Sequence, residues 1–309
     1  MNFKDMDVVS IRDFSREQIE EILERSRQML PYARGEKISK ALEGKILGNL
    51  FFEPSTRTRL SFESAANRLG ARVIDVSQTS ETSMVKGETL ADTIRMVEAY
   101  SDVIVLRHPH EGAARLAARF SNKPVINAGD GAGSHPTQTL LDLFTIEEEL
   151  GNIEGMNVTL LGDLKYGRTA HSLAEALTVL GAKLTFVAPE TLQMPKETVD
   201  RVKQLGGSPL ITSDIEGIIS SVDVLYVTRI QRERFPDPAE YQKVAGTYRV
   251  DREMLREAKK DMIVMHPLPR IDEIAPEVDS TPHAKYFKQA FNGIPVRMAL
   301  LTLVLGVEV

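Results

Sequence analysis

The 309-residue sequence contains no cysteine. Disulfide bonds, zinc sites built on thiolates and a cysteine nucleophile are therefore excluded. No stretch approaches the ~20 apolar residues that a membrane-spanning helix needs, and the first residues lack the apolar core of a signal peptide. We expect a cytoplasmic protein with no membrane partner.

Positive charge is in deficit as well, since 38 lysines and arginines stand against 44 aspartates and glutamates and give a formal net charge of −6. Binding along a nucleic-acid backbone needs a basic face, so we expect no nucleic-acid partner. The Walker lysine motif is missing. Residues 129–134 depart from a dinucleotide fingerprint, because the sixth position is serine and no acidic ribose ligand follows at a suitable spacing. An NAD-linked oxidoreductase is disfavoured, and we expect no cofactor and no metal.

Apolar runs of strand length alternate with helical patterns along the whole chain. The predicted strands are residues 46–52, 72–76, 103–106, 124–127, 157–161, 183–187, 222–227 and 262–265. The first helix begins after Ser15, which has a capping-box partner in Gln18, and is predicted to end at Pro31. This alternation, over a chain long enough for two domains, predicts an α/β fold of parallel sheets covered on both faces.

The segment Ser55-Thr56-Arg57-Thr58 stands between the predicted strand 46–52 and a helix that ends at Gly70. Backbone N–H groups and the positive end of the helix dipole gather at such a turn. Three hydroxyls and a guanidinium would complete a cradle for phosphate without a glycine-rich loop. An ordinary helix cap beside a solvated arginine would give the same pattern, so both interpretations stay open.

Arginines follow several of the predicted strands: Arg57, Arg107, Arg168, Arg229 and Arg270. Ligands of open α/β sheets bind beyond the carboxyl ends of the strands. The five arginines therefore predict a cleft between two domains that takes a phosphate and one or more carboxylates. Surface salt bridges are the alternative interpretation.

His135 follows a glycine-rich turn and precedes Pro136, a favourable first residue of a helix. A helix N-terminus disfavours imidazolium, which leaves a neutral ring able to donate one hydrogen bond to a carbonyl oxygen. Gln138 lies on the same face and could add an amide contact. A structural histidine is the alternative. Ser83 and Lys86, from their residue types alone, are typical of a solvated loop.

Taken in order, these segments resemble the signature motifs of the aspartate/ornithine carbamoyltransferase family. The motifs are residues 55–59 with Phe62-Glu63, Ser83 with 86–89, 107–109, 135–138, Arg168, 228–231 and 266–270. They cover nearly the whole chain. The aspartate branch is more similar, because ornithine enzymes typically carry His-Cys-Leu-Pro where this chain has His-Pro-Leu-Pro at 266–269. The loop from Ser83 to Lys86 is one residue shorter than in some members.

The resemblance implies a transferase that moves the carbamoyl group of carbamoyl phosphate to the amine of L-aspartate. The products are N-carbamoyl-L-aspartate and phosphate, in pyrimidine biosynthesis. It implies two doubly wound parallel-sheet domains with the active site in the cleft between them. Residues 1–134 with the C-terminal helix 285–309 would bind carbamoyl phosphate, and residues 135–284 aspartate, with an interdomain helix at about 135–150. A carbamoyltransferase for another amine such as ornithine, and a non-catalytic anion-binding protein, are the alternatives.

The resemblance also implies a role for each motif residue. The residues that hold carbamoyl phosphate would be Ser55, Thr56, Arg57, Thr58, Ser83, Lys86, Arg107, His135 and Gln138, with the main-chain carbonyls of Leu268 and Pro269. Those that act in catalysis would be Arg57, Thr58, Lys86, Arg107 and His135, and those that bind aspartate Lys86, Arg168, Arg229 and Gln231. Ser83 and Lys86 would reach the neighbouring subunit's site in a homotrimer. A separate regulatory chain is left open as a partner.

Overall fold

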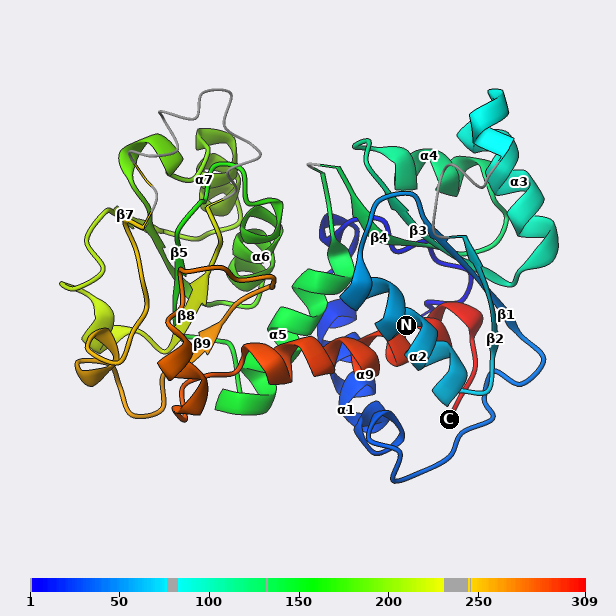
Figure 1. Cartoon of the computed structure of the whole chain (residues 1–309). Helices are drawn as coiled ribbons and strands as arrows, with labels where there is room; N and C mark the ends of the chain where they lie inside the picture. The colour runs from blue at the N-terminus through cyan, green and yellow to red at the C-terminus, as the bar shows by residue number, and fades with distance from the viewer. Residues whose placement is uncertain (1, 77–82, 132, 231–243, 245) are drawn as a thin grey trace. The chain divides into compact units, whose positions relative to one another are not determined.

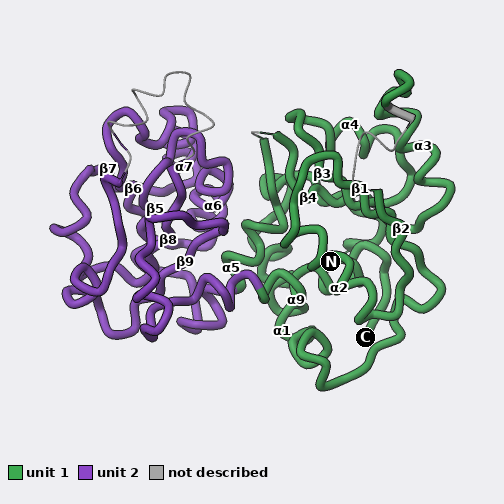
Figure 2. Tube along the Cα trace, in the orientation of Figure 1, with its two compact units in different colours: residues 1–144, 291–309 green, residues 145–290 purple. Residues whose placement is uncertain are grey.

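The computed structural model describes residues 2–76, 83–131, 133–230, 244 and 246–309 (Figure 1). The chain divides into two compact units, coloured separately in Figure 2. Unit 1 comprises Met1–Phe144 with Phe291–Val309, and unit 2 comprises Thr145–Ala290. Both divisions fall within helices, α5 (Pro136–Leu150) and α9 (Tyr286–Leu305), ten and six residues after the predicted boundaries at 134/135 and 284/285. None of the described helices is long and apolar enough to cross a membrane.

The described strands of unit 1 form a four-stranded parallel sheet in the order β2-β1-β3-β4. Their bounds are β1 (Ile46–Phe51), β2 (Arg72–Val76), β3 (Val103–His108) and β4 (Val125–Asp130). β1, β3 and β4 are almost wholly buried, whereas β2 at the edge is largely exposed. Continuous apolar runs suit strands covered on both faces, so the predicted parallel architecture is confirmed for this unit.

Helices cover both faces of this sheet (Figure 1). They are α1 (Arg16–Ala33), α2 (Thr56–Arg68), α3 (Leu90–Tyr100) and α4 (Ala113–Phe120). α3 packs against α4, and α1 against α2. The predicted capping box of α1 is confirmed, since the Ser15 hydroxyl accepts from the Gln18 N–H and the Gln18 side chain accepts from the Ser15 N–H.

The prediction that α1 ends at Pro31 is wrong, because the helix continues to Ala33. Pro31 lies in the last turn, where its missing N–H removes one hydrogen bond. Leu30 and Ala33 on either side of it are buried in the core, and this packing offsets the lost bond. Helix α2 ends as predicted, with Gly70 following it at φ +86°.

Unit 2 has a five-stranded parallel sheet among its described residues, in the order β7-β6-β5-β8-β9. The strands are β5 (Asn157–Leu161), β6 (Lys183–Val187), β7 (Leu210–Thr212), β8 (Val224–Val227) and β9 (Ile263–Met265). Helices α6 (Arg168–Val179) and α7 (Lys196–Gln204) pack side by side. A buried cluster that includes Leu225, Val264 and Tyr286 forms much of the core.

Candidate active site

In unit 1 the strand order reverses between β1 and β3, because β1 leads outward to β2 and β3 leads the other way to β4. Such a switch point, beyond the carboxyl ends of the strands, is where open α/β sheets bind ligands. The segment 55–58 follows β1, and Arg107 lies in β3 opposite Phe51 of β1. The structure therefore brings the predicted phosphate cradle and Arg107 to adjacent strands at this point.

Ser55 occupies the N-cap position of α2. Its side chain makes no capping hydrogen bond, so the hydroxyl is not used as in an ordinary helix cap. Thr58 in the first turn is buried, whereas Thr56 and Arg57 are exposed. The first-turn N–H groups and the positive end of the helix dipole thus lie beside the three hydroxyls, as a phosphate site requires.

The guanidinium of Arg107 is held by two partners. Its Nη1 donates to the main-chain oxygen of Ala128 at 3.1 Å, and its Nη2 lies 3.2 Å from a carboxylate oxygen of Glu53. Its Nε is buried and has no hydrogen-bond partner among the described residues. Burial lowers the pKa of Arg107, the charge of Arg57 lowers it further, and Glu53 opposes both effects.

Partial desolvation also lowers the pKa of Arg57, and the charge of Arg57 acts on the more deeply buried Arg107, so the two guanidinium charges lie near each other. This arrangement favours an anionic ligand, because an anion would offset both the lost hydration and the mutual repulsion. Glu53 was not among the predicted site residues, since nothing in the sequence indicates which cation it pairs with.

A third guanidinium near Arg107, that of Arg297 in α9, was also missed. It is 2% exposed, its Nη2 donates to the Thr137 hydroxyl at 3.2 Å, and it lies over the ring of Phe62 at 4.9 Å from the centroid. Burial lowers the pKa of Arg297 to about 9; Asp142 opposes this shift and the charge of Arg107 adds to it. The group stays protonated at pH 7, and its place inside an apolar helix gave no sequence signal.

His135 is buried immediately before α5, as predicted, and its Nδ1 lies 3.5 Å from the Thr137 hydroxyl. The Gln138 amide nitrogen donates to Asp142 at 2.8 Å, so a ligand N–H would be accepted by the Gln138 Oε1. The glycine-rich loop before His135 folds around Asp130, whose carboxylate accepts from the N–H groups of Ser134 and Gly112.

In unit 2 the strand order reverses between β5 and β8. Arg168 is the first residue of α6, on the segment that follows β5, and Arg229 follows β8. Residues 266–270 follow β9, which pairs with β8. The structure therefore brings Arg168, Arg229, Leu268 and Pro269 to segments that begin at one edge of a parallel sheet.

A tight contact joins the ends of β5 and β8. The Thr228 hydroxyl lies 3.1 Å from the main-chain oxygen of Leu161 and 3.2 Å from that of Asp163. Gly162 between them has φ +117°, and a Cβ at this position would lie 2.4 Å from the Thr228 oxygen. Only glycine allows the two strand ends to approach this closely, and the contact fixes where Arg229 leaves the sheet.

Replacing Gly162 with alanine is expected to lower the free energy of unfolding by about 3 kcal/mol, because the Cβ would overlap backbone atoms. Gly155→Ala is the matched control, since Gly155 has φ +78° and none of the described atoms lies within 4 Å of an added Cβ; it should cost only about 1 kcal/mol. Urea denaturation of both variants measures the difference. Equal losses would show that the close approach at Gly162 has no energetic importance.

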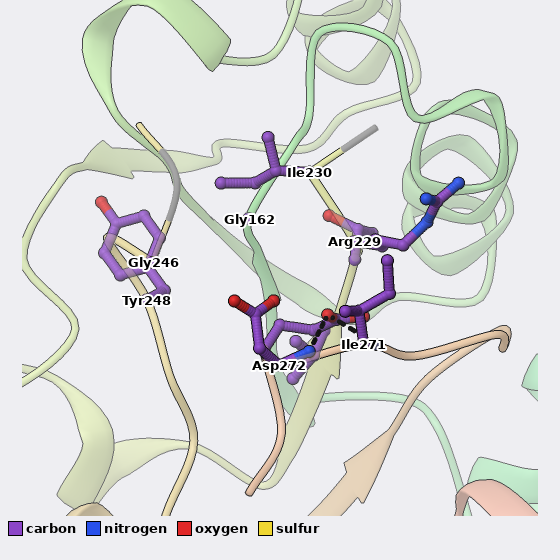
Figure 3. A pocket seen from close by; sticks show the side chains of 10 residues that line it. Gly162, Arg229, Ile230, Gly246, Tyr248, Ile271 and Asp272 are labelled. Carbon is purple, nitrogen blue, oxygen red and sulfur yellow. Dashed lines mark hydrogen bonds between the residues drawn. The ribbon is translucent and has the colours of Figure 1, made fainter. Parts of the chain in front are cut away.

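Figure 3 shows a pocket at this edge of unit 2. Its lining includes Gly162, Thr228 and Arg229 from the strand ends, with Tyr248 and Asp272. The Tyr248 hydroxyl donates to the main-chain oxygen of Ser213 at 2.8 Å. The pocket thus combines groups of both charges, which suits a ligand that carries a carboxylate and an amine.

The prediction that Arg270 contributes to an anion site is wrong. Its guanidinium forms an ion pair with Asp279, donates to the Tyr286 hydroxyl at 2.9 Å, and stacks over the rings of Tyr286 and Phe287. The hydrogen bond that Arg270 donates to Asp279 raises the pKa of Arg270. Arg270 follows a strand, as the prediction required, but its side chain contacts other residues of the protein.

Three predicted site residues remain: Ser83, Lys86 and Gln231. Ser83 and Lys86 belong to a short 3-10 helix, Ser83–Lys86, in unit 1, and Lys86 is exposed. Gln231 lies outside the described residues. Within the described part of the chain, no three histidine, aspartate or glutamate side chains gather as ligands of a metal ion would.

Family comparison supports the resemblance seen in the motifs. The carbamoyl-phosphate-binding domain of aspartate/ornithine carbamoyltransferases matches residues 6–148, and the aspartate/ornithine-binding domain matches residues 154–304. The chain belongs to the aspartate/ornithine carbamoyltransferase family. The family predicted from the ordered motifs is thus confirmed.

Members of the aspartate branch are similar over their full length. The chain is 57% identical to the aspartate carbamoyltransferase catalytic subunit of Methanocella arvoryzae over 310 residues, covering 100% of each. It is 60% identical to that of Thermococcus kodakarensis over 307 residues, covering 99% of each.

Two solved carbamoyltransferase structures share this fold. The M. jannaschii aspartate transcarbamoylase catalytic subunit has a TM-score of 0.90 at 52% identity, covering 96% of this chain and 97% of that one. The Trypanosoma cruzi aspartate transcarbamoylase in complex with carbamoyl phosphate and aspartate has a TM-score of 0.92 at 41% identity, covering 98% of each. The fold of two parallel-sheet α/β domains is therefore that of this family.

Proposed function

We propose that this chain transfers the carbamoyl group of carbamoyl phosphate to the amine of L-aspartate, as a cytoplasmic step of pyrimidine biosynthesis. The observation that carries the proposal is the pairing of Arg57 with Arg107 at the switch point of unit 1, where burial lowers the pKa of both. Relatives that are 57% and 60% identical over their full length are aspartate carbamoyltransferase catalytic subunits, which supports the choice of substrates.

The phosphate of carbamoyl phosphate binds to the N-terminal turn of α2. Ser55, Thr56 and Thr58 donate hydroxyl hydrogen bonds, the turn adds backbone N–H groups, and Arg57 adds charge. Arg107 bridges the phosphate and the carbonyl oxygen, for which its buried Nε gives direct support.

The carbonyl group is polarised by Thr58, Arg107 and His135, which donate to its oxygen as negative charge develops there. The Gln138 Oε1 and the main-chain carbonyls of Leu268 and Pro269 accept hydrogen bonds from the carbamoyl NH2. These contacts fix the plane of the carbamoyl group, so its carbonyl oxygen stays directed at its donors. Catalysis then results from positioning and from preorganised charge.

Aspartate binds through its carboxylates to Arg168, Arg229 and Gln231, with Lys86 added from a neighbouring subunit. Its uncharged amine attacks the carbonyl carbon and a C–N bond forms. The amine nitrogen gives up one proton to the phosphate, and the C–O bond to that phosphate breaks. Because the attacking amine belongs to the substrate, the reaction needs no nucleophile from the protein.

We place the chain in a homotrimer with shared sites, in which Ser83 and Lys86 serve the neighbouring copy. Exposed apolar side chains on α2, β2 and α3 support contact between copies: Leu60, Ile74, Met96 and Tyr100. Among the described strands, β2 also lies at the edge of its sheet, where another chain could pair with it. The relatives are named catalytic subunits, so the proposal includes a separate regulatory chain as a partner.

A competition assay tests this function against the two alternatives. Purified protein is given carbamoyl phosphate with equal aspartate and ornithine, and N-carbamoyl-L-aspartate is expected as the main product. Arg168 and Arg229 favour carboxylates and repel the cationic side chain of ornithine. Carbamoylation of ornithine alone would assign another amine substrate, and binding of carbamoyl phosphate without any product would assign a non-catalytic anion-binding protein.

A further inference from the structure

Strand β9 leads into a buried histidine whose contacts determine its tautomer. His266 is 1% exposed, and its Nδ1 accepts a hydrogen bond from the Leu268 N–H at 2.8 Å. A ring nitrogen that accepts carries no proton, so the hydrogen of the neutral ring is on Nε2. Nε2 lies 2.6 Å from a carboxylate oxygen of Glu273, which is also buried, and donates to it.

The protonation states agree with this geometry. Burial lowers the pKa of His266 by more than the hydrogen bond to Glu273 raises it, so the ring is neutral at pH 7. Burial raises the pKa of Glu273, but its hydrogen bonds, the first of them from His266, outweigh that effect and hold the pKa below its ordinary value. A neutral imidazole therefore donates to a charged carboxylate.

The carboxylate of Glu273 also accepts hydrogen bonds from the backbone of the loop that follows β9. The other oxygen of Glu273 accepts from the N–H groups of Ile271 and Asp272, each at 3.1 Å, and Figure 3 marks these bonds. At the start of the loop, Leu268 has φ +54°, a left-handed conformation that costs a non-glycine residue about 1 kcal/mol. The hydrogen bond from the Leu268 N–H to His266 stabilises that conformation.

We propose that His266, oriented by Glu273, is a positioning residue for the carbamoyl group. It fixes the backbone of Leu268 so that the carbonyl oxygens of Leu268 and Pro269 face the NH2 of carbamoyl phosphate. The inference rests on the proposed function, in which these two carbonyls accept from that NH2. It assigns to this loop the selection of a carbamoyl group over an acyl group, which has no N–H to donate.

Two substitutions separate the hydrogen bonds of His266. His266→Asn keeps the acceptor for Leu268, because the asparagine Oδ1 takes the place of Nδ1, but it loses the donor to Glu273. His266→Gln keeps that donor, because the glutamine Nε2 takes the place of the ring Nε2, but it loses the acceptor. Calorimetric titration should show a Kd for carbamoyl phosphate raised about tenfold in His266→Gln and threefold or less in His266→Asn.

The order of stability should be the reverse of the order of binding. His266→Asn leaves a buried oxygen of Glu273 without its donor, so it should unfold at lower urea concentration than His266→Gln. If His266 were merely structural, binding would fall in step with stability. The inference is overturned if the more stable variant also binds carbamoyl phosphate better.

Acetyl phosphate isolates the NH2 contact, because a methyl group replaces the NH2. The preference of the protein for carbamoyl phosphate over acetyl phosphate should fall about tenfold in His266→Gln and persist in His266→Asn. Equal losses of both ligands in His266→Gln would mean that the phosphate cradle, and not the NH2 contact, had changed, and would reject the inference.

The wild-type protein provides the remaining controls. A wild type that forms no N-carbamoyl-L-aspartate rejects the proposed function, whereas an active wild type whose two variants bind alike rejects only the role of His266. If neither variant folds, NMR of wild-type protein carrying 15N-histidine decides. The Nδ1 signal of a neutral, Nε2-protonated His266 should shift with carbamoyl phosphate and not with acetyl phosphate; a protonated ring at pH 7, or equal shifts, would overturn the inference.

Discussion

Replacing Arg107 with alanine is expected to lower turnover by about 10²–10³-fold, the usual cost of losing one donor to a developing oxyanion. The guanidinium is fixed by Ala128 and Glu53 and keeps a buried Nε without a partner among the described residues, so its charge is preorganised for a ligand. Steady-state assays with both substrates measure the loss, and circular dichroism checks that the variant is folded.

Arg115→Ala is the matched control for this experiment. Arg115 belongs to the same unit, its side chain is 53% exposed, and it forms an ion pair with Asp13 at 3.0 Å. Its loss should leave turnover within about twofold, since exposed ion pairs contribute ~0–1 kcal/mol. Near-normal turnover of Arg107→Ala would remove Arg107 from the mechanism.

Mixing two inactive variants is expected to restore activity. Arg57→Ala removes the charge of the phosphate cradle, and Lys86→Ala removes the contribution of the neighbouring subunit, so each variant alone should lose at least ~10²-fold in turnover. After subunit exchange, a single site can contain an intact Arg57 from one chain and an intact Lys86 from another. Random assembly makes about a quarter of the sites complete.

The recovered activity should therefore approach about a quarter of the wild-type value as exchange proceeds. A mixture of Arg57→Ala with Arg107→Ala is the control, since both residues belong to unit 1 of one chain and no exchange can place intact copies in one site. Absence of recovery in the first mixture, with exchange verified by mass measurement, would reject shared sites.

Local sequence patterns predict most of the regular elements. The apolar runs locate eight of the described strands, and Ser15 and Gly70 mark helix ends through local hydrogen bonding and backbone conformation. Strand β7 was not predicted, because three residues are too few for a periodic signal and Leu210 and Ile211 are exposed at the sheet edge. Pro31 shows that core packing can outweigh a local helix-ending signal.

The site was predictable where position in the chain determines position in the sheet. Segments that follow parallel strands must emerge at one edge, which brings Arg57 beside Arg107 in unit 1 and Arg168 to the same edge as Arg229 in unit 2. Side-chain partners depend on tertiary packing instead. For that reason Arg270 was assigned to a ligand although Asp279 holds it.

The buried groups near the site are even harder to predict from the sequence. Arg297 lies inside an apolar helix, and the pairing of His266 with Glu273 joins two residues of a loop. Neither pattern distinguishes a solvated side chain from a buried one. Their burial, and the pKa shifts that it causes, emerge only from the folded chain.

We propose that arginines of unit 1 bind the phosphate end of the substrates and that arginines of unit 2 bind the carboxylates of aspartate. N-(phosphonacetyl)-L-aspartate, the ligand in one T. cruzi aspartate transcarbamoylase structure, carries both kinds of group in a single molecule. A crystal structure of this chain with that compound is the most direct test. We predict Arg57 and Arg107 on the phosphonate and Arg168 and Arg229 on the carboxylates; a phosphonate bound away from Arg57 and Arg107 would contradict the account.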